Sequence, residues 1–196
     1  DVYDNAMFLI ALDYLLEMAP DSPQAPRWRS LREGIAKNVR THLWDEKRQK
    51  FIPHIYPEKS PIPEGFDELA IHYHGGTAIA IEAGLLSKDE IRTVNAQMLE
   101  NVRLSGMPSI GLTLYPVYPD GFFHGGMSKA YLYQNGGDWT WFGGRMIQQL
   151  VVNGMVEEAY AEIHPMIERV IQNDGFYEWY GKGGVPSGSG NFKGSA

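Results

Sequence analysis

Side chains suited to binding a carbohydrate are concentrated in one short stretch, residues 133–145. A sugar offers hydroxyls that need paired donors and acceptors, and flat C–H faces that stack on aromatic rings. We predict that the residues of this stretch that supply both kinds of group bind a sugar: Tyr133, Gln134, Asn135, Asp138, Trp139 and Trp141. The alternative is a helix N-terminus that Asp138 caps, with its two tryptophans in the core.

A carboxylate near the C-terminal end of the sequence is surrounded by aromatic residues. Acid/base cleavage of a glycosidic bond needs two carboxyl groups that face each other across the sugar. Glu178 is the favoured candidate, because its aromatic neighbours could wall a sugar pocket. Trp179 is the neighbour that we expect to stack on the sugar. The alternative for Glu178 is a carboxylate in a solvated loop.

The composition excludes several other kinds of site. The formal net charge is −7 and no Lys/Arg cluster stands out, so neither nucleic acid nor a membrane is an expected partner. Cysteine is absent, which excludes thiol catalysis. No phosphate or dinucleotide fingerprint occurs, and we expect no cofactor. His72 and His74 are a poor metal pair without another ligand nearby, so no metal site is predicted. The sequence does not indicate the cellular compartment of the protein.

Two kinds of helical segment alternate along the chain. Residues 5–16 are apolar on every face, which is typical of a helix that is buried all round. Residues 23–43 carry apolar side chains at helical spacing between charged ones, which is typical of a surface helix. The pair recurs in residues 77–102 and in residues 139–171. The recurrence predicts an all-α toroid of helical hairpins, with buried helices inside and amphipathic helices outside.

Long polar and aromatic loops separate the predicted hairpins, and such loops are usually functional. A short β-hairpin is predicted near residues 44–56, because bulky residues flank a charged centre. If the hairpins alternate up and down, the segments that lead into the three buried helices share one end of the toroid. These segments add three candidate substrate-binding residues: Asp4, Asn5 and His74.

Three short motifs carry a resemblance to known enzymes. Residues 1–6 are similar to the motif V-D-L-N-A, and residues 133–139 to the loop Y-x-x-G-x-x-W. Residues 176–180 and 192–196 resemble E-x-Y…G…F-x-W-S-A. Together the motifs resemble those of the (α/α)6-toroid, or six-hairpin, glycosidases, especially inverting enzymes of the trehalase and processing α-glucosidase kind. The resemblance implies that Glu178 is the catalytic base.

Two features depart from that family pattern. Lys193 and Gly194 stand where the family has an aromatic residue before Ser-Ala, and the family's general acid would lie before residue 1. Because three hairpins are half of six, we expect residues 1–196 to form a single domain that is about half of a toroid. Missing hairpins or a second subunit would complete the ring. Without them we expect the inner-helix residues Ile79, Ile81, Ile147 and Val151 to lack partners.

The leading hypothesis is a glycoside hydrolase that cleaves an oligosaccharide or another glycoside with inversion. One alternative is a sugar epimerase or isomerase on a similar toroid, in which His72, His74 or His124 transfers protons. Only that enzyme would interconvert free monosaccharides. The other alternative is a helical saccharide-binding or scaffold protein, which would show no turnover.

Overall fold

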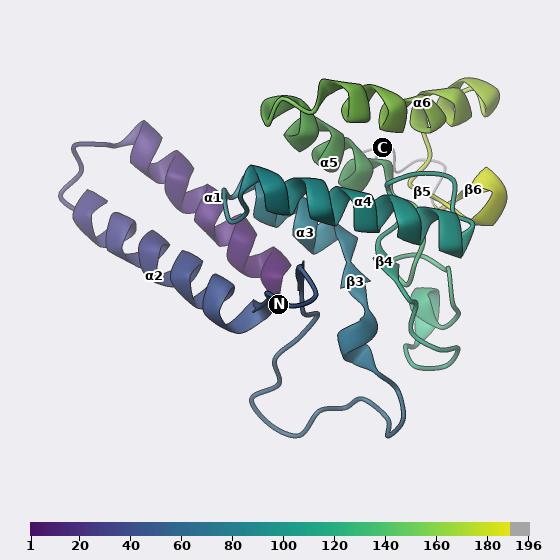
Figure 1. The fold of residues 1–196 in the computed structure, drawn as a ribbon, viewed down its shortest axis with the longest axis horizontal. Helices are drawn as coiled ribbons and strands as arrows, with labels where there is room; N and C mark the ends of the chain where they lie inside the picture. Colours follow the sequence, from purple (N-terminus) through teal and green to yellow (C-terminus); the bar gives the residue numbers. More distant parts are fainter. Residues whose placement is uncertain (189–196) are drawn as a thin grey trace.

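The computed structural model describes residues 1–188 and shows three consecutive helix pairs there (Figure 1). The pairs are α1 (Val2–Met18) with α2 (Ala25–Leu43), α3 (His74–Glu82) with α4 (Lys88–Ser105), and α5 (Thr140–Val152) with α6 (Val156–Gln172). Helix α3 packs between α1 and α5, so these three form an inner layer. The predicted all-α arrangement of helix pairs is confirmed.

Polar contacts join the second members of the pairs into an outer layer. Arg40 of α2 donates a hydrogen bond to Glu90 of α4. Asn95 of α4 donates one to Glu162 of α6. Helix α4 is therefore held on both sides, and it covers the middle of the arc (Figure 1).

Local sequence signals set the helix ends. Gly84 and Gly154 follow α3 and α5 with φ of 72° and 81°, a left-handed conformation that glycine adopts without strain. Ser87 and Glu90 form the capping box that opens α4. At the start of α1, the Asp1 carboxylate accepts a hydrogen bond from the backbone N–H of Asp4.

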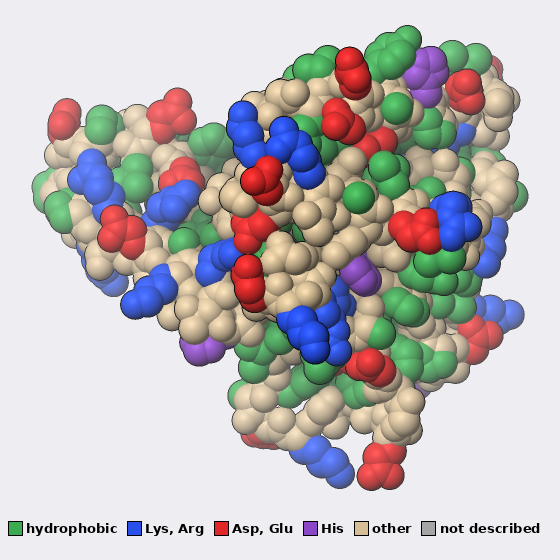
Figure 2. Space-filling view, in the orientation of Figure 1, with side chains coloured by type: hydrophobic (Ala, Val, Ile, Leu, Met, Phe, Trp, Pro, Cys, Tyr) green, Lys and Arg blue, Asp and Glu red, His purple; other side chains and the backbone are tan. Residues whose placement is uncertain are grey.

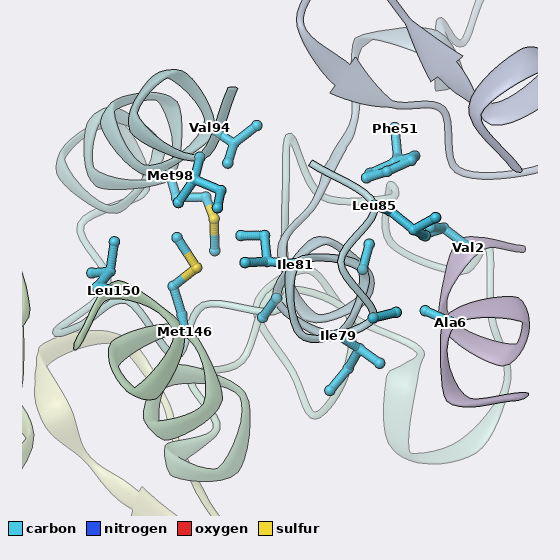
Figure 3. Packing of buried hydrophobic residues seen from close by; sticks show 14 of the residues in the cluster. Val2, Ala6, Phe51, Ile79, Ile81, Leu85, Val94, Met98, Met146 and Leu150 are labelled. Atoms are coloured by element: carbon cyan, nitrogen blue, oxygen red, sulfur yellow. The ribbon is translucent and has the colours of Figure 1, made fainter. Parts of the chain in front are cut away.

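The hydrophobic core surrounds α3. Ile79 and Ile81 lie among side chains from α1, α4 and α5, including Ala6, Met98 and Met146 (Figure 3). Ile79, Ile81 and Ile147 are 0%, 4% and 7% exposed, so the expectation that they lack partners is wrong. The reason is that α3 lies in the middle of the arc and α4 covers it. Val151 is exposed, as expected.

The two ends of the arc expose apolar side chains instead. Helix α1 is not buried all round: it packs mainly against α2 and α3, and Tyr14 and Met18 are 56% and 73% exposed. At the other end, Ile167 and Ile171 of α6 are exposed. Hydrophobic side chains are visible at both ends, over α1 and α2 and over α5 and α6 (Figure 2).

Short strands fix the loops. The predicted hairpin near residues 44–56 is confirmed, since β1 (Trp44–Asp45) pairs antiparallel with β2 (Lys50–Phe51). Two further antiparallel pairs join β3 (His72–Tyr73) to β4 (Leu114–Tyr115), and β5 (Trp179–Tyr180) to β6 (Pro186–Ser187). Single turns of 3-10 helix occur at Glu68–Ala70, Gly125–Met127 and Lys182–Gly184.

Candidate functional site

The N-terminal ends of the three inner helices lie together on the same side of the arc, as the alternation of hairpins predicts. Tyr3 of α1 lies with its ring centroid 6.4 Å from those of both Trp141 and Phe142 of α5. A Cβ added to Gly75, in the first turn of α3, would lie 2.7 Å from the Phe142 ring. Glycine at that position therefore allows α5 to bring an aromatic ring against α3.

A cavity of about 160 Å³ opens beside these helix ends. Tyr73, Gly75 and Phe142 line it from the start of α3 and α5, and loop residues complete the wall, among them His54, Thr113 and Gln134. Its lining is mainly apolar with a few convergent polar groups, which is typical of a small-molecule site.

Gln134 and Asn135 have different environments although they are adjacent. Gln134 is exposed and lines the cavity. Asn135 is buried, where its Oδ1 accepts a hydrogen bond from the N–H of Tyr118 and its Nδ2 donates to the carbonyls of Tyr118 and Lys129. The side chain of Asn135 thus joins two loops, and the geometry supports substrate contact for Gln134 only.

The aromatic residues of the predicted site mostly contact one another. Tyr133 packs edge to face against Trp139 and Trp179, with centroid distances of 4.9 and 6.3 Å. Trp139 and Trp179 are 5% and 7% exposed, which leaves little surface for stacking on a sugar. Trp141 is partly exposed, and the Arg145 guanidinium lies 5.0 Å from its ring centroid. Trp141 and Tyr133 are the better stacking candidates.

Asp138 is completely buried. Its carboxylate lies 2.7 Å from Nη1 of Arg169 and accepts a 2.6 Å hydrogen bond from the Ser109 hydroxyl. Burial raises the pKa of Asp138 above its ordinary value, while the Arg169 charge and the Ser109 hydroxyl oppose that rise. Asp138 does not cap α5, whose N-cap is Trp139. The geometry gives Asp138 a structural ion pair, not a surface that a sugar could touch.

The candidates in the first turns of α1 and α3 also have different environments. His74 is buried, with its Nε2 3.0 Å from Nδ2 of Asn101, and burial lowers its pKa to about 3, so the ring stays neutral and links α3 to α4. Nδ2 of Asn5 donates to the carbonyl of Asp1. Asp4 is exposed in the first turn of α1, at the cavity end of the helix. Asp4 and Asn5 therefore stay predictions, while His74 has no surface for a ligand.

Glu178 is partly buried and directly precedes β5. A Cβ added to Gly188 would collide with the Glu178 side chain, so the carboxylate lies against the backbone at residue 188. Strand β5 is tied to the predicted sugar-binding stretch, because Tyr180 and Asp138 exchange two backbone hydrogen bonds. The motif in residues 192–196 lies outside the described residues.

Sequence reasoning missed Glu68. Its Oε1 accepts hydrogen bonds from the Tyr118 hydroxyl at 2.6 Å, from the Tyr56 hydroxyl at 2.8 Å and from Nδ1 of His54 at 2.8 Å. Burial raises the pKa of Glu68, but the three donors together bring it below its ordinary value. No local pattern marks Glu68, because its partners lie in loops distant in sequence.

Two other kinds of site find no support in the described part of the chain. Within residues 1–188, no group of three or more His, Asp or Glu side chains is placed to hold a metal ion. No helix in that range is long and apolar enough to cross a membrane. On the face in Figure 2, basic and acidic side chains are interspersed, without one large basic patch.

Comparison with known proteins identifies the fold. Neither a family model nor a curated protein sequence matches the chain. Three solved structures of the GH63 mannosylglycerate hydrolase from Thermus thermophilus do match. The complex with Tris and D-glycerate has a TM-score of 0.70 at 17% identity, the glucose complex 0.71 at 18%, and the Tris complex 0.65 at 15%. Each match covers 100% of this chain and 43% of the hydrolase. The chain therefore has the fold of part of an (α/α)6 toroid and spans less than half the length of these enzymes.

Proposed function

We propose that the chain is part of an inverting glycoside hydrolase, with Glu178 as the general base that activates water. The observation that carries the proposal is the match of the whole chain to the mannosylglycerate hydrolase structures, one of which holds glucose. The aromatic cavity at the N-terminal ends of the inner helices supports it. Glu178 belongs to the same loop assembly, through the bridge between Tyr180 and Asp138.

The histidine environments argue against the epimerase alternative. Proton transfer needs an imidazole that reaches the substrate and titrates near neutral pH. Burial lowers the pKa of His74 to about 3, and burial and the Lys50 charge lower the pKa of His72 to about 4. Both rings therefore stay neutral at physiological pH. His124 is exposed on a loop and does not line the cavity.

The proposed substrate is a neutral hexose joined to a second group through a glycosidic bond. Mannosylglycerate and α-glucosides are the first compounds to test, given the name of the similar hydrolase, the glucose bound in one of its structures and the resemblance to α-glucosidases. Inversion requires a general acid opposite Glu178, about 6.5–9.5 Å from it, so that a water molecule fits between the sugar and the base. The resemblance places that acid before residue 1.

Replacing Glu178 by Gln tests the proposal in the active enzyme. The variant keeps the size of the side chain and loses its basicity, so kcat should fall by about 10²–10⁴-fold without loss of folding. Azide needs no deprotonation, so it should restore turnover in this variant and give a glycosyl azide of inverted configuration.

Glu64→Gln is the matched control, because Glu64 is an exposed carboxylate in a loop. It should keep the parent kcat. NMR of the first-formed anomer reports the stereochemistry. Retention of configuration, or near-normal hydrolysis by Glu178→Gln, would reject the proposed role of Glu178.

A further inference from the structure

A polar cluster stands beside the cavity and has no part in the proposed acid/base step. His54 and Tyr118 both line the cavity and both hydrogen-bond to Oε1 of Glu68. Tyr56 donates a third hydrogen bond to the same oxygen. The Glu68 side chain is only 10% exposed. Side chains from the connection between β2 and β3 and from the loop after β4 thus fix one another at the cavity wall.

Glu68 determines which ring nitrogen of His54 carries a proton. Its three donors bring its pKa below the ordinary value although burial raises it, so Glu68 is ionised at neutral pH and can only accept hydrogen bonds. The contact between Oε1 of Glu68 and Nδ1 of His54 therefore requires a proton on Nδ1. Nε2 remains as the nitrogen that His54 can offer to a ligand, as an acceptor when the ring is neutral.

Two other polar groups of the cavity wall are already engaged. The Tyr118 hydroxyl donates to Glu68. Oγ1 of Thr113 donates to the carbonyl of Gln134 and accepts from the N–H of Gly136. Of these cavity side chains, His54 and the exposed amide of Gln134 are left to recognise a ligand.

These groups match the chemistry of one sugar ring. A hydroxyl can donate to an imidazole nitrogen, a second can bond to an amide, and a C–H face can pack on aromatic rings such as those of Tyr73 and Phe142. We propose that the cavity is a subsite for an uncharged hexose ring, in which Nε2 of His54, oriented by Glu68, accepts a hydrogen bond from a sugar hydroxyl.

This inference rests on the proposed function, because it concerns the same end of the toroid. It makes His54 a specificity-determining residue and Glu68 a positioning residue. A hydroxyl that hydrogen-bonds to His54 contributes to affinity, and an analogue without that hydroxyl loses the contribution. One of the monodeoxy derivatives of the bound hexose should therefore bind much more weakly than the others.

Two substitutions of His54 test the roles of its two ring nitrogens separately. His54→Asn keeps an amide near the position of Nδ1, so it can still donate to Glu68, but has no atom at the position of Nε2. His54→Gln reaches the position of Nε2 and loses the contact with Glu68. We expect His54→Asn to weaken binding of D-glucose or D-mannose by about 10-fold or more, and His54→Gln to weaken it less.

The binding measurement is an NMR titration of the 15N-labelled 196-residue chain with D-glucose and, separately, D-mannose. The ring 15N signals of His54 should show a protonated Nδ1 before sugar is added, and the Nε2 signal should shift on binding. Glu68→Gln should mix the two tautomers and reduce affinity. Tyr14→Phe, at an exposed position of α1 outside the cavity lining, is the control and should bind close to the parent.

The outcomes distinguish the inference from the function on which it rests. If the parent binds a hexose at the cavity and His54→Asn binds it equally well, the assignment of His54 is overturned while the proposed function stands. If His54 carries its proton on Nε2 in the sugar-free chain, the positioning role of Glu68 is overturned. If neither hexose shifts any cavity resonance, the hexose subsite is overturned. If, in addition, the active enzyme hydrolyses no glycoside, the proposed function is overturned with it.

Discussion

Glu162 is a buried carboxylate without a cationic partner in its described surroundings. It is 5% exposed, its Oε1 accepts a hydrogen bond from Asn95, and its Oε2 has no hydrogen-bond partner among the described residues. Burial raises the pKa of Glu162 to about 7, the negative charge of Glu158 adds to the rise, and the Asn95 hydrogen bond opposes it. The fold therefore favours protonated Glu162.

This pKa predicts how stability depends on pH. The folded-state pKa lies above that of the unfolded chain, about 4.3, so the contribution of Glu162 to stability is full below that value and is lost as pH rises through about 7. Glu162→Gln keeps the acceptor and carries no charge. We expect it to be more stable than the parent by about 1–3 kcal/mol at pH 8 and similar to the parent at pH 4, below the unfolded pKa.

Urea denaturation of both proteins at the two pH values measures this difference. Glu168→Gln, at an exposed position of the same helix, is the control and should change little. If Glu162→Gln shows the same pH dependence as the parent, Glu162 is ionised in the fold and the prediction fails.

At the scale of elements, one buried ion pair joins four segments. Arg169 of α6 pairs with Asp138 before α5, and it donates hydrogen bonds to Ser109 and Thr140. Its guanidinium also lies 4.0 Å from the ring centroid of Tyr180 in β5. This contact thus fixes the relative positions of the loop before β4, both helices of the third pair and β5.

Asp138→Asn should therefore destabilise the fold, because it leaves a buried guanidinium without its counter-ion. The expected loss is about 3–5 kcal/mol in the free energy of unfolding. The double variant Asp138→Leu with Arg169→Met removes both charges and should recover much of that loss. Denaturation of the parent, of Asp138→Leu, of Arg169→Met and of the double variant measures the coupling. An Asp138→Asn protein with parent stability and lost sugar affinity would instead assign Asp138 to the substrate.

At the scale of the whole molecule, the arc leaves apolar surface at α6. A groove of about 350 Å³ runs between α5 and α6, lined by Ile163, Met166, Ile167, Ile171 and Phe176 among others. Ile171 is 72% exposed and Phe176 is 51% exposed. Contiguous apolar surface of this kind usually contacts another chain or segment, and in a closed toroid a further helix would cover it.

We therefore expect the 196-residue chain by itself to associate as its concentration rises, and to lack hydrolase activity. Ile171→Glu should reduce association, because it places a charge in the apolar surface. Gln172→Glu adds the same charge at the neighbouring exposed residue and is the matched control. Light scattering after size-exclusion chromatography measures both. A parent chain that is monomeric and fully active would contradict the half-toroid interpretation.

The helices and turns were predictable from the sequence because they depend on neighbours a few residues apart. Apolar spacing identified the three helix pairs, glycine identified the links at Gly84 and Gly154, and the capping box at Ser87 identified the start of α4. The meeting of the three inner-helix N-termini followed from the alternation of hairpins. The same reasoning wrongly predicted that α1 is buried all round, because its position at the end of the arc is not encoded locally.

The environment of each polar side chain was decided by the tertiary structure alone. Asp138 and Asn135 are of residue types that often bind sugars. Their side chains are buried instead against partners from other segments, Arg169 and Tyr118. Glu68 went unnoticed because its bond from Tyr118 joins residues 50 positions apart. The residue type determines which hydrogen bonds a side chain can make. The long-range packing of the chain determines whether its partner in those bonds is another part of the protein or a ligand.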